Sequence, residues 1–575
     1  MSDHVLRHTR SLGNPQRVLL IGTSLVLAVA SGLFVAGVGN AVLWFLFTLV
    51  ISTSVKTFFS KGYASVERLD PAGDAPTVSR VTTFVLALSS TVALAWLVLH
   101  REPLPWLDLG TSALATALFC MLTMVLVLSI HRLPLLSFPG LFLGATFLFT
   151  CSALVLYQSE GIDAFSRWQL IDIPSVLIAM PVVMLAFSSF LIGALLVRKP
   201  LRVPDAPSSG EEGHSRTLRR IGIGLYVVSI ATIGAFTLTG SALSFAFEGG
   251  YEAYAGARKA GELSQILRVA FDPFLPWSIL ILAATSKNRG DHLRVLLLAI
   301  PAIGIMFLAG DRGTPLPLIL LIVSAGRLLG LRITWRQSLV GIGAVVLLLP
   351  AVANLRKTPT SQWSTEVLTR SIANQVEDRP AFDQGPLEAV LASTAVNYQT
   401  LMATVMTVPV VEGFRYGRDY LRPLLVAIPF YPSDEVLLGV DLGKVPSDWV
   451  KAILNDDRVA GPGYLQVAEA YLQFGALGVL GLYLLLGWGL TRLWRYLVTT
   501  RPDPRIVALS LFMMARILLW VRNQSTGMLR AFLWGVLLVY VAPAVLRKLR
   551  GFARPISADS GALVHNKLGA SPARR

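Results

Sequence analysis

Long apolar runs recur along most of this chain, and they restrict its fold more than any other feature. Runs of roughly 15 to 24 apolar residues, each close to the length that crosses a bilayer, can be placed about fourteen times. They start near residues 18, 41, 81, 111, 139, 174, 221, 269, 294, 314, 337, 466, 506 and 530. Hydrophobic residues make up 54% of the sequence and charged residues only 15%, whereas soluble domains carry about 25% charged residues. The sequence therefore predicts an all-α integral membrane protein with about fourteen transmembrane helices.

The formal charge of +16 has a membrane explanation rather than a nucleic-acid one. The Lys and Arg residues cluster in short segments between apolar runs, which is how cytoplasmic loops are marked. If Arg7, Arg10 and Arg17 are inside, alternation of the spans places most of the remaining basic loops inside as well. We therefore expect both termini to be cytoplasmic and do not expect nucleic-acid binding.

The expected organisation is uneven along the chain. The segments are a cytoplasmic N-terminus (1–17), transmembrane helices 1–11 (18–354), a large extracytoplasmic loop (355–465), transmembrane helices 12–14 (466–546) and a cytoplasmic tail predicted to be disordered (547–575). A loop as long as 355–465 is usually functional or disordered. Helical spacing of apolar residues between Pro386 and Met406 favours an ordered amphipathic helix lying on the membrane surface.

A polar stripe opens the twelfth predicted span. The sequence from Gly461 to Gly478 carries Gln466, Glu469 and Gln473, which fall on one face of a helix. An ionised group near the start of a membrane helix persists only if it faces protein, water or a polar ligand. The stripe is therefore the first candidate for the wall of a functional site.

Several site classes find no support in the sequence. The two cysteines, Cys120 and Cys151, each lie inside a predicted span, and we interpret them as small apolar side chains that pack in the interior. We find no Cys/His cluster and no Gly-rich phosphate loop ending in Lys-Ser or Lys-Thr. The sequence therefore implies neither a metal nor a cofactor, and it does not support ATP-driven transport.

The order of motifs in the second half resembles that of the Wzy-type O-antigen and exopolysaccharide repeat-unit polymerases. The matching pieces are Gly310-Asp311-Arg312-Gly313, Tyr416-Gly417-Arg418-Asp419-Tyr420 with Ile428-Pro429, and Gly463 through Gly478. This resemblance implies a GT-C-like membrane glycosyltransferase in the bacterial inner membrane. Its implied partners are undecaprenyl-pyrophosphate-linked oligosaccharides, the lipid bilayer and a separate chain-length regulator.

Such a polymerase uses a sugar hydroxyl of one lipid-linked unit to displace the pyrophosphate-lipid of another, and we expect an inverting, metal-independent reaction. A base must take the hydroxyl proton, and Glu469 fits best. Guanidinium groups and polar or aromatic side chains would hold the pyrophosphate and glycan. The candidates for this binding role are Arg312, Arg356, Arg415, Arg418, Arg422, Arg522, Arg530, Tyr416, Tyr464, Gln466 and Gln473.

Each of these assignments has a structural alternative. For Arg312 the alternative is a turn in which Asp311 neutralises its charge, although the flanking glycines allow close ligand approach. The spacing of Arg415, Arg418 and Arg422 puts them on one face if the segment is helical, and that face could simply be solvated. Arg516, inside the thirteenth span, should face a partner such as Glu469 or a buried carbonyl group.

Other acids and other functions stay open. Carboxylates in the outside regions could also reach the site: Asp311, Glu412, Asp419, Asp434, Glu435, Asp441, Asp448, Asp456 and Asp457. An O-antigen ligase would be expected to carry a catalytic His in its large outside loop, and residues 355–465 contain none. A lipid-linked oligosaccharide flippase would instead spread polar residues near the midplane of several helices. A structural scaffold would need neither Glu469 nor a glycine-flanked arginine.

Overall fold

The described part of the chain is a bundle of membrane-length helices. The computed structural model describes residues 77–103, 108–161, 172–197, 211–238, 274–308, 314–328, 391–392, 394–426, 444–454, 463–499, 503–525 and 528–552. No strand occurs among these residues. Each expected span falls in or near a described helix, except those starting near 18, 41 and 337, which lie outside the described residues.

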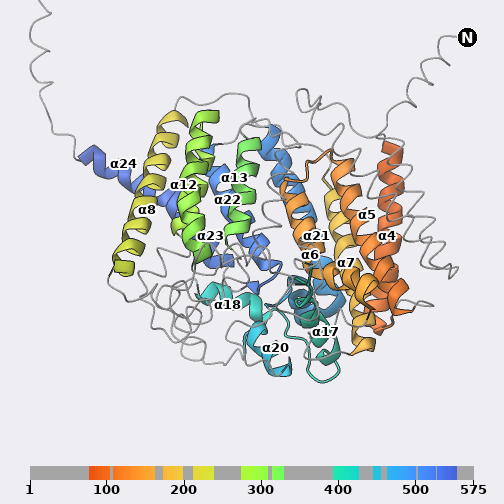
Figure 1. The fold of residues 1–575 in the computed structure, drawn as a ribbon. Helices are drawn as coiled ribbons and strands as arrows, with labels where there is room; N and C mark the ends of the chain where they lie inside the picture. The colour runs from red at the N-terminus through yellow and green to blue at the C-terminus, as the bar shows by residue number, and fades with distance from the viewer. Residues whose placement is uncertain are drawn as a thin grey trace, which may run out of the picture.

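Six helices are long and apolar enough to cross a membrane, by length and composition, within the described ranges. They are α4 (Thr77–His100), α5 (Leu109–Ile130), α6 (Phe138–Glu160), α7 (Ile173–Leu195), α8 (Glu211–Leu238) and α21 (Gln466–Thr499). Beside them stand α11 (Leu275–Ala284), α12 (Arg289–Leu308), α13 (Pro315–Leu328), α22 (Pro504–Trp520), α23 (Met528–Val536), the π-helix η7 (Leu537–Val541) and α24 (Ala542–Phe552). Three short helices gather at one end of the bundle (Figure 1): α17 (Tyr398–Thr407), α18 (Arg418–Val426) and α20 (Pro446–Leu454).

Several membrane helices begin at side-chain caps that the sequence encodes. The side chains of Asp108, Ser137 and Asp172 accept hydrogen bonds from backbone N–H groups in the first turns of α5, α6 and α7. Asp503 caps α22 in the same way, with Pro504 at the first helical position. These caps satisfy amide groups that would otherwise lack partners at a helix start.

Two glycines bring the backbones of α7 and α21 into direct contact. A Cβ atom at Gly193 would lie 2.0 Å from the carbonyl oxygen of Leu484, and one at Gly487 would lie 2.1 Å from that of Phe190. Small residues at such crossings let membrane helices approach closely and gain dispersion contacts. This packing fixes the position of α21, whose first turns carry the predicted polar stripe.

The prediction of an amphipathic helix on the membrane surface is wrong for the part of it that the structure describes. In α17, Tyr398, Leu401 and Val405 are buried, and so are the polar Gln399 and Thr400 on its other sides. The helix packs against α6, α7 and α21 and therefore has no solvent face. Its polar side chains face protein rather than water, which sequence periodicity does not distinguish.

We expect Gly193→Ala to destabilise the protein, because the added methyl group meets the backbone of α21 and forces α7 and α21 apart. The loss in unfolding free energy should be about 1–3 kcal/mol, seen as a lower melting temperature in detergent. The matched control is Gly481→Ala in α21, where a Cβ would meet nothing within 4 Å. Equal melting temperatures for the two variants would contradict the close-packing argument.

Candidate active site

The helix that carries the polar stripe is broken after two turns. Phe474 and Gly475 have non-helical backbone angles, and Gly475 (φ 61°, ψ −141°) occupies a region that is essentially restricted to glycine. A Cβ at Gly478 would lie 2.1 Å from the carbonyl oxygen of Ala470, so the chain folds back on itself at this point. We call residues 466–473 the short arm and residues 476–499 the long arm. The break separates the polar residues from the apolar membrane-spanning run.

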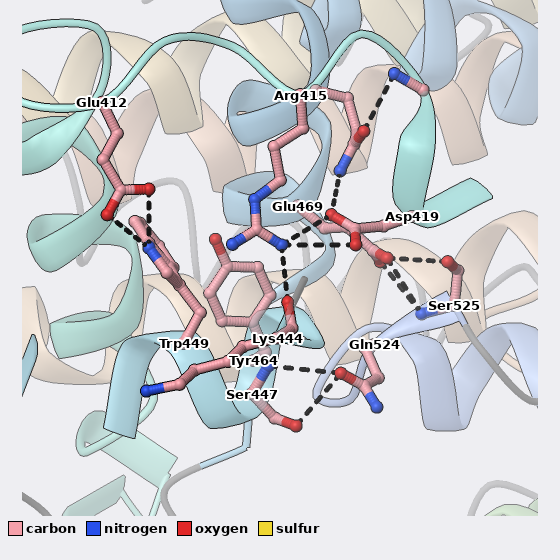
Figure 2. Close-up of polar contacts among 12 residues, drawn as sticks. Glu412, Arg415, Asp419, Lys444, Ser447, Trp449, Tyr464, Glu469, Gln524 and Ser525 are labelled. Carbon is pink, nitrogen blue, oxygen red and sulfur yellow. Dashed lines mark hydrogen bonds and ion pairs between the residues drawn. The ribbon is translucent and has the colours of Figure 1, made fainter. Parts of the chain in front are cut away.

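Glu469 is fully buried on the short arm and is held by donors at the end of α22 and in the segment that follows it. The indole N–H of Trp520 donates to its Oε2 at 2.6 Å. The backbone N–H of Ser525 donates to the same oxygen at 3.0 Å, and the Ser525 hydroxyl donates to Oε1 at 2.7 Å (Figure 2). A buried carboxylate is tolerated only with such partners. Glu469 therefore fixes residues 520–525 against the short arm.

A second carboxylate is tied to the same arm through Gln473. The Gln473 side chain accepts from the Gly417 backbone N–H at 2.9 Å and donates to Asp419 Oδ2 at 2.6 Å. Arg415 donates to Asp419 at 3.1 Å and to the Lys444 carbonyl oxygen at 2.9 Å. Figure 2 shows Arg415, Asp419, Glu469 and Ser525 converging from different elements. We call Arg415, Asp419, Glu469, Gln473 and Ser525 the polar cluster.

Aromatic side chains enclose one side of the polar cluster. The guanidinium carbon of Arg415 lies 5.2 Å from the ring centroid of Trp449, a cation–π distance. The indole N–H of Trp449 in turn donates to the Glu412 carboxylate at 2.9 and 3.0 Å. Glu412 is exposed, so it ends this chain of contacts at the surface.

The turn before the short arm brings Arg522 into the neighbourhood. The backbone N–H groups of Tyr464 and Gln466 donate to the carbonyl oxygens of Arg522 (2.8 Å) and Val521 (3.2 Å). Gly463 has φ 86°, and a Cβ there would lie 2.6 Å from the Arg522 carbonyl oxygen, so only glycine fits. The Arg522 guanidinium carbon lies 6.0 Å from the ring centroid of Phe149.

Some buried polar atoms near the cluster have no hydrogen-bond partner within the part of the chain that the structure describes. They include the Tyr420 hydroxyl, both amide atoms of Gln466 and Oδ1 of Asn397. Burial raises the pKa of Tyr420 and of Tyr464, so both phenols stay protonated near neutral pH. The Tyr464 hydroxyl shares a hydrogen bond of 2.9 Å with Thr404, whereas that of Tyr420 has no hydrogen-bond partner among the described residues.

The predicted binding residues do not all meet. Tyr464, Gln466 and Gln473 are buried at or beside the short arm, and Tyr416 is exposed next to it. Arg312 and Arg356 lie outside the described residues. Two of the other candidates belong to α18, where Arg418 is exposed and Arg422 is half-buried. Arg530 belongs to α23.

The prediction that Arg415, Arg418 and Arg422 share one helical face is wrong for Arg415, which lies outside the helix. Tyr416 (φ 49°) and Gly417 (φ 85°) are left-handed, so the helix begins only at Arg418 and Arg415 lies in the preceding turn. This turn, rather than a helix, aims Arg415 at Asp419. Sequence spacing could not reveal it because a non-glycine residue rarely adopts positive φ.

The partners of Glu469 also differ from the expected one. Its donors are Trp520 and Ser525, whereas Arg516 lines a small cavity between α11, α13 and α22. Trp520 and Ser525 carry no sequence signal for this role, because a tryptophan at the end of a span is interpreted as apolar.

Among the nine other carboxylates considered, Asp419 joins the cluster and Glu412 borders it. Asp448 is exposed on α20, and the remaining six are outside the described residues. No group of three or more His, Cys, Asp or Glu in the described ranges could hold a metal ion.

Comparison with known proteins identifies one family. The model of a family described as O-antigen polysaccharide polymerase Wzy matches residues 83–549. Neither the curated proteins nor the solved structures include a significant match to this chain. The matched range contains every member of the polar cluster.

The ion pair of Arg415 and Asp419 should show a larger coupling energy than a more exposed pair with the same N···O distance. Their side chains are 11% and 3% exposed at an N···O distance of 3.1 Å. A double-mutant cycle of Arg415→Gln and Asp419→Asn should give a coupling energy of about 0.5–3 kcal/mol in detergent unfolding. The control pair is Arg219–Asp291, also 3.1 Å apart but 35% and 13% exposed, which should couple more weakly. A stronger coupling in the control would contradict this reading.

Proposed function

Because this chain belongs to the O-antigen polysaccharide polymerase Wzy family, we propose that its polar cluster is the site where lipid-linked repeat units are joined. The protein is a multi-pass membrane protein and an O-antigen repeat-unit polymerase. The single observation that supports the location is the buried Glu469, held at one end of the bundle inside the matched range. An intramembrane carboxylate with specific partners is a functional-site candidate by default.

The cluster lies where a lipid-linked substrate would present its pyrophosphate, if that end of the bundle faces outward. Arg132, Lys287 and Arg505 lie where the chain turns between α5 and α6, α11 and α12, and α21 and α22, at the end of the bundle opposite α17, α18 and α20 (Figure 1). Arg219 of α8 donates to Asp291 in the first turn of α12 and belongs to the same end. Basic residues of that kind mark the cytoplasmic side. We therefore propose that the protein lies in the bacterial inner membrane with both termini cytoplasmic and the polar cluster on the outer side.

The proposed reaction displaces a pyrophosphate from a sugar carbon. A hydroxyl oxygen of one repeat unit forms a bond to C1 of the other, and the bond from C1 to the pyrophosphate oxygen breaks. The electron pair leaves with the undecaprenyl pyrophosphate, and attack opposite the leaving group inverts C1. No metal is needed if side chains supply the base and the anion contacts.

We propose that Glu469 receives the proton of the attacking hydroxyl, and that Ser525 passes the proton on to it. Glu469 is fully buried and both of its oxygens accept hydrogen bonds inside the protein, so a sugar hydroxyl does not contact it directly. The Ser525 hydroxyl, which donates to Oε1, can accept the sugar proton while passing its own proton to Glu469. The carboxylate is then the final base and the serine is the relay.

Arginines near the cluster supply the proposed pyrophosphate contacts. Arg522 is the first candidate, because it lies between Trp520 and Ser525, the two residues that donate to Glu469. Arg415 is oriented by Asp419 through one of its terminal nitrogens, Nη1. Arg312 and Arg356, outside the described residues, are proposed as further members. A chain-length regulator is proposed as a partner.

Two other functions receive less support from the site. In a flippase we would expect polar side chains near the midplane of several helices, whereas the cluster described here lies at one end of the bundle. The family match also favours polymerase over ligase.

We expect Glu469→Gln to lower polymerisation by roughly 10²- to 10⁴-fold, the usual contribution of a positioned base. Ser525→Ala should lower it as well, because the relay hydroxyl is lost while the backbone N–H contact remains. The measurement is product length and rate in proteoliposomes supplied with defined lipid-linked repeats. In cells, single lipid-linked repeats should accumulate on the outer leaflet.

Glu412→Gln is the matched control, because Glu412 also accepts from a tryptophan indole but at the surface. It should keep near-normal activity. Full activity of Glu469→Gln would overturn the assignment, and accumulation of repeats on the inner leaflet would indicate failed flipping instead. Melting temperatures of all variants separate lost chemistry from lost folding.

A further inference from the structure

The segment between α17 and α18 exposes large apolar side chains at the end of the bundle that carries the polar cluster. Val411 is 77% exposed and Val410 is nearly as open, although both belong to a well-defined turn. Contiguous exposed apolar side chains usually mark an interaction site with protein or membrane. We call residues 408–416 the α17–α18 turn.

Hydrogen bonds hold this turn at both ends. The Arg101 guanidinium donates to the Val408 carbonyl oxygen at 2.9 Å, and the Val411 N–H donates to the Thr407 carbonyl oxygen at 2.7 Å. At the other end, the N–H groups of Arg415 and Tyr416 donate to carbonyl oxygens of the short arm at 3.1 and 2.9 Å. The exposure of the two valines is therefore fixed by the fold.

The elements that hold the turn also present apolar surface outward. Arg101 directly follows α4, which exposes Val92, Trp96 and Leu99 along one side. Beyond the break in α21, Leu477 is 70% exposed at the first turn of the long arm. In a membrane protein such faces of spanning helices meet lipid tails. The α17–α18 turn is bonded to Arg101, beside the end of α4, and to the short arm, which directly precedes the long arm, so its exposed valines lie near helices with outward-facing apolar side chains.

We propose that the α17–α18 turn inserts Val410 and Val411 into the outer leaflet of the bilayer, with acyl chains as the partner. The polar side chains of the same turn contact protein instead: Glu412 accepts from Trp449, and Arg415 donates to Asp419. Tyr416 packs edge-on against Phe474, as suits a tyrosine at the boundary between lipid and headgroups.

Anchoring of the turn would also position the polar cluster for the reaction, an effect that rests on the proposed function. The turn joins the membrane surface directly to Arg415 and, through the short arm, to Glu469. Insertion of the valines holds the polar cluster at headgroup depth, where the pyrophosphate of a lipid-linked substrate lies. A substrate can then arrive sideways from the leaflet without lifting its isoprenoid chain into water.

The test is the depth of a spin label at position 411 in proteoliposomes. In the variant Val411→Cys a nitroxide can be attached selectively, because Cys120 and Cys151 are both buried. Collision with oxygen, which concentrates in the bilayer, is compared with collision with a water-soluble nickel chelate. The references are Leu477→Cys on the long arm and Asp448→Cys, which is exposed on α20.

The label at 411 should match position 477, with oxygen collisions several-fold more frequent than nickel collisions. A label that behaves as at position 448 would overturn the proposal. Low collision rates with both reagents would also overturn it, since they would place a second copy or another protein over the turn. If Val411→Cys does not fold, the same comparison at Val410 decides the question.

A second experiment, on enzyme kinetics, separates this proposal from the polymerase assignment. Val410→Asp with Val411→Asp should raise the KM for lipid-linked repeats at least tenfold while kcat changes little, and Val410→Leu with Val411→Leu should keep both. An unchanged KM in the aspartate variant would count against anchoring. The spin-label result does not depend on catalysis, so it stands even if the proposed chemistry fails.

Discussion

Burial of the Glu469 carboxylate is the interaction on which the arrangement of the site depends. A carboxylate removed from water needs compensating donors, and here one indole and one serine supply three of them. All three come from residues 520–525, so satisfying this group fixes where α22 ends relative to α21. The position of Arg522 then follows, because it lies between the two residues that donate. One electrostatic requirement thus organises two segments distant in the sequence.

The break at Gly475 lets a single segment serve two environments. The long arm packs against α7 through glycines, which suits a helix surrounded by lipid and other helices. The short arm carries Gln466, Glu469 and Gln473 into a polar setting at the bundle end. A continuous helix would have carried this stripe along the same axis as the apolar run. The backbone freedom of one glycine therefore makes the site compatible with the membrane.

Helical periodicity predicted the polar stripe correctly, because side chains three and four residues apart share a face whatever surrounds the helix. The same rule failed for α17, where polar and apolar sides are both covered by protein. It failed again for Arg415, which a left-handed turn at Tyr416 and Gly417 separates from α18. Trp520 and Ser525 could not be assigned, since their importance arises only from contact with Glu469.

The sequence by itself determined that this chain is helical, lies in a membrane, belongs to a polymerase family and carries a carboxylate where ionised groups are costly. These properties follow from the length and spacing of apolar runs and from local motifs, which act over a few residues. Only the tertiary structure decided which groups satisfy Glu469, which arginine meets Asp419 and which valines stay uncovered. Those outcomes depend on contacts between residues far apart in the chain, and a buried charge selects its partners only when the helices have packed.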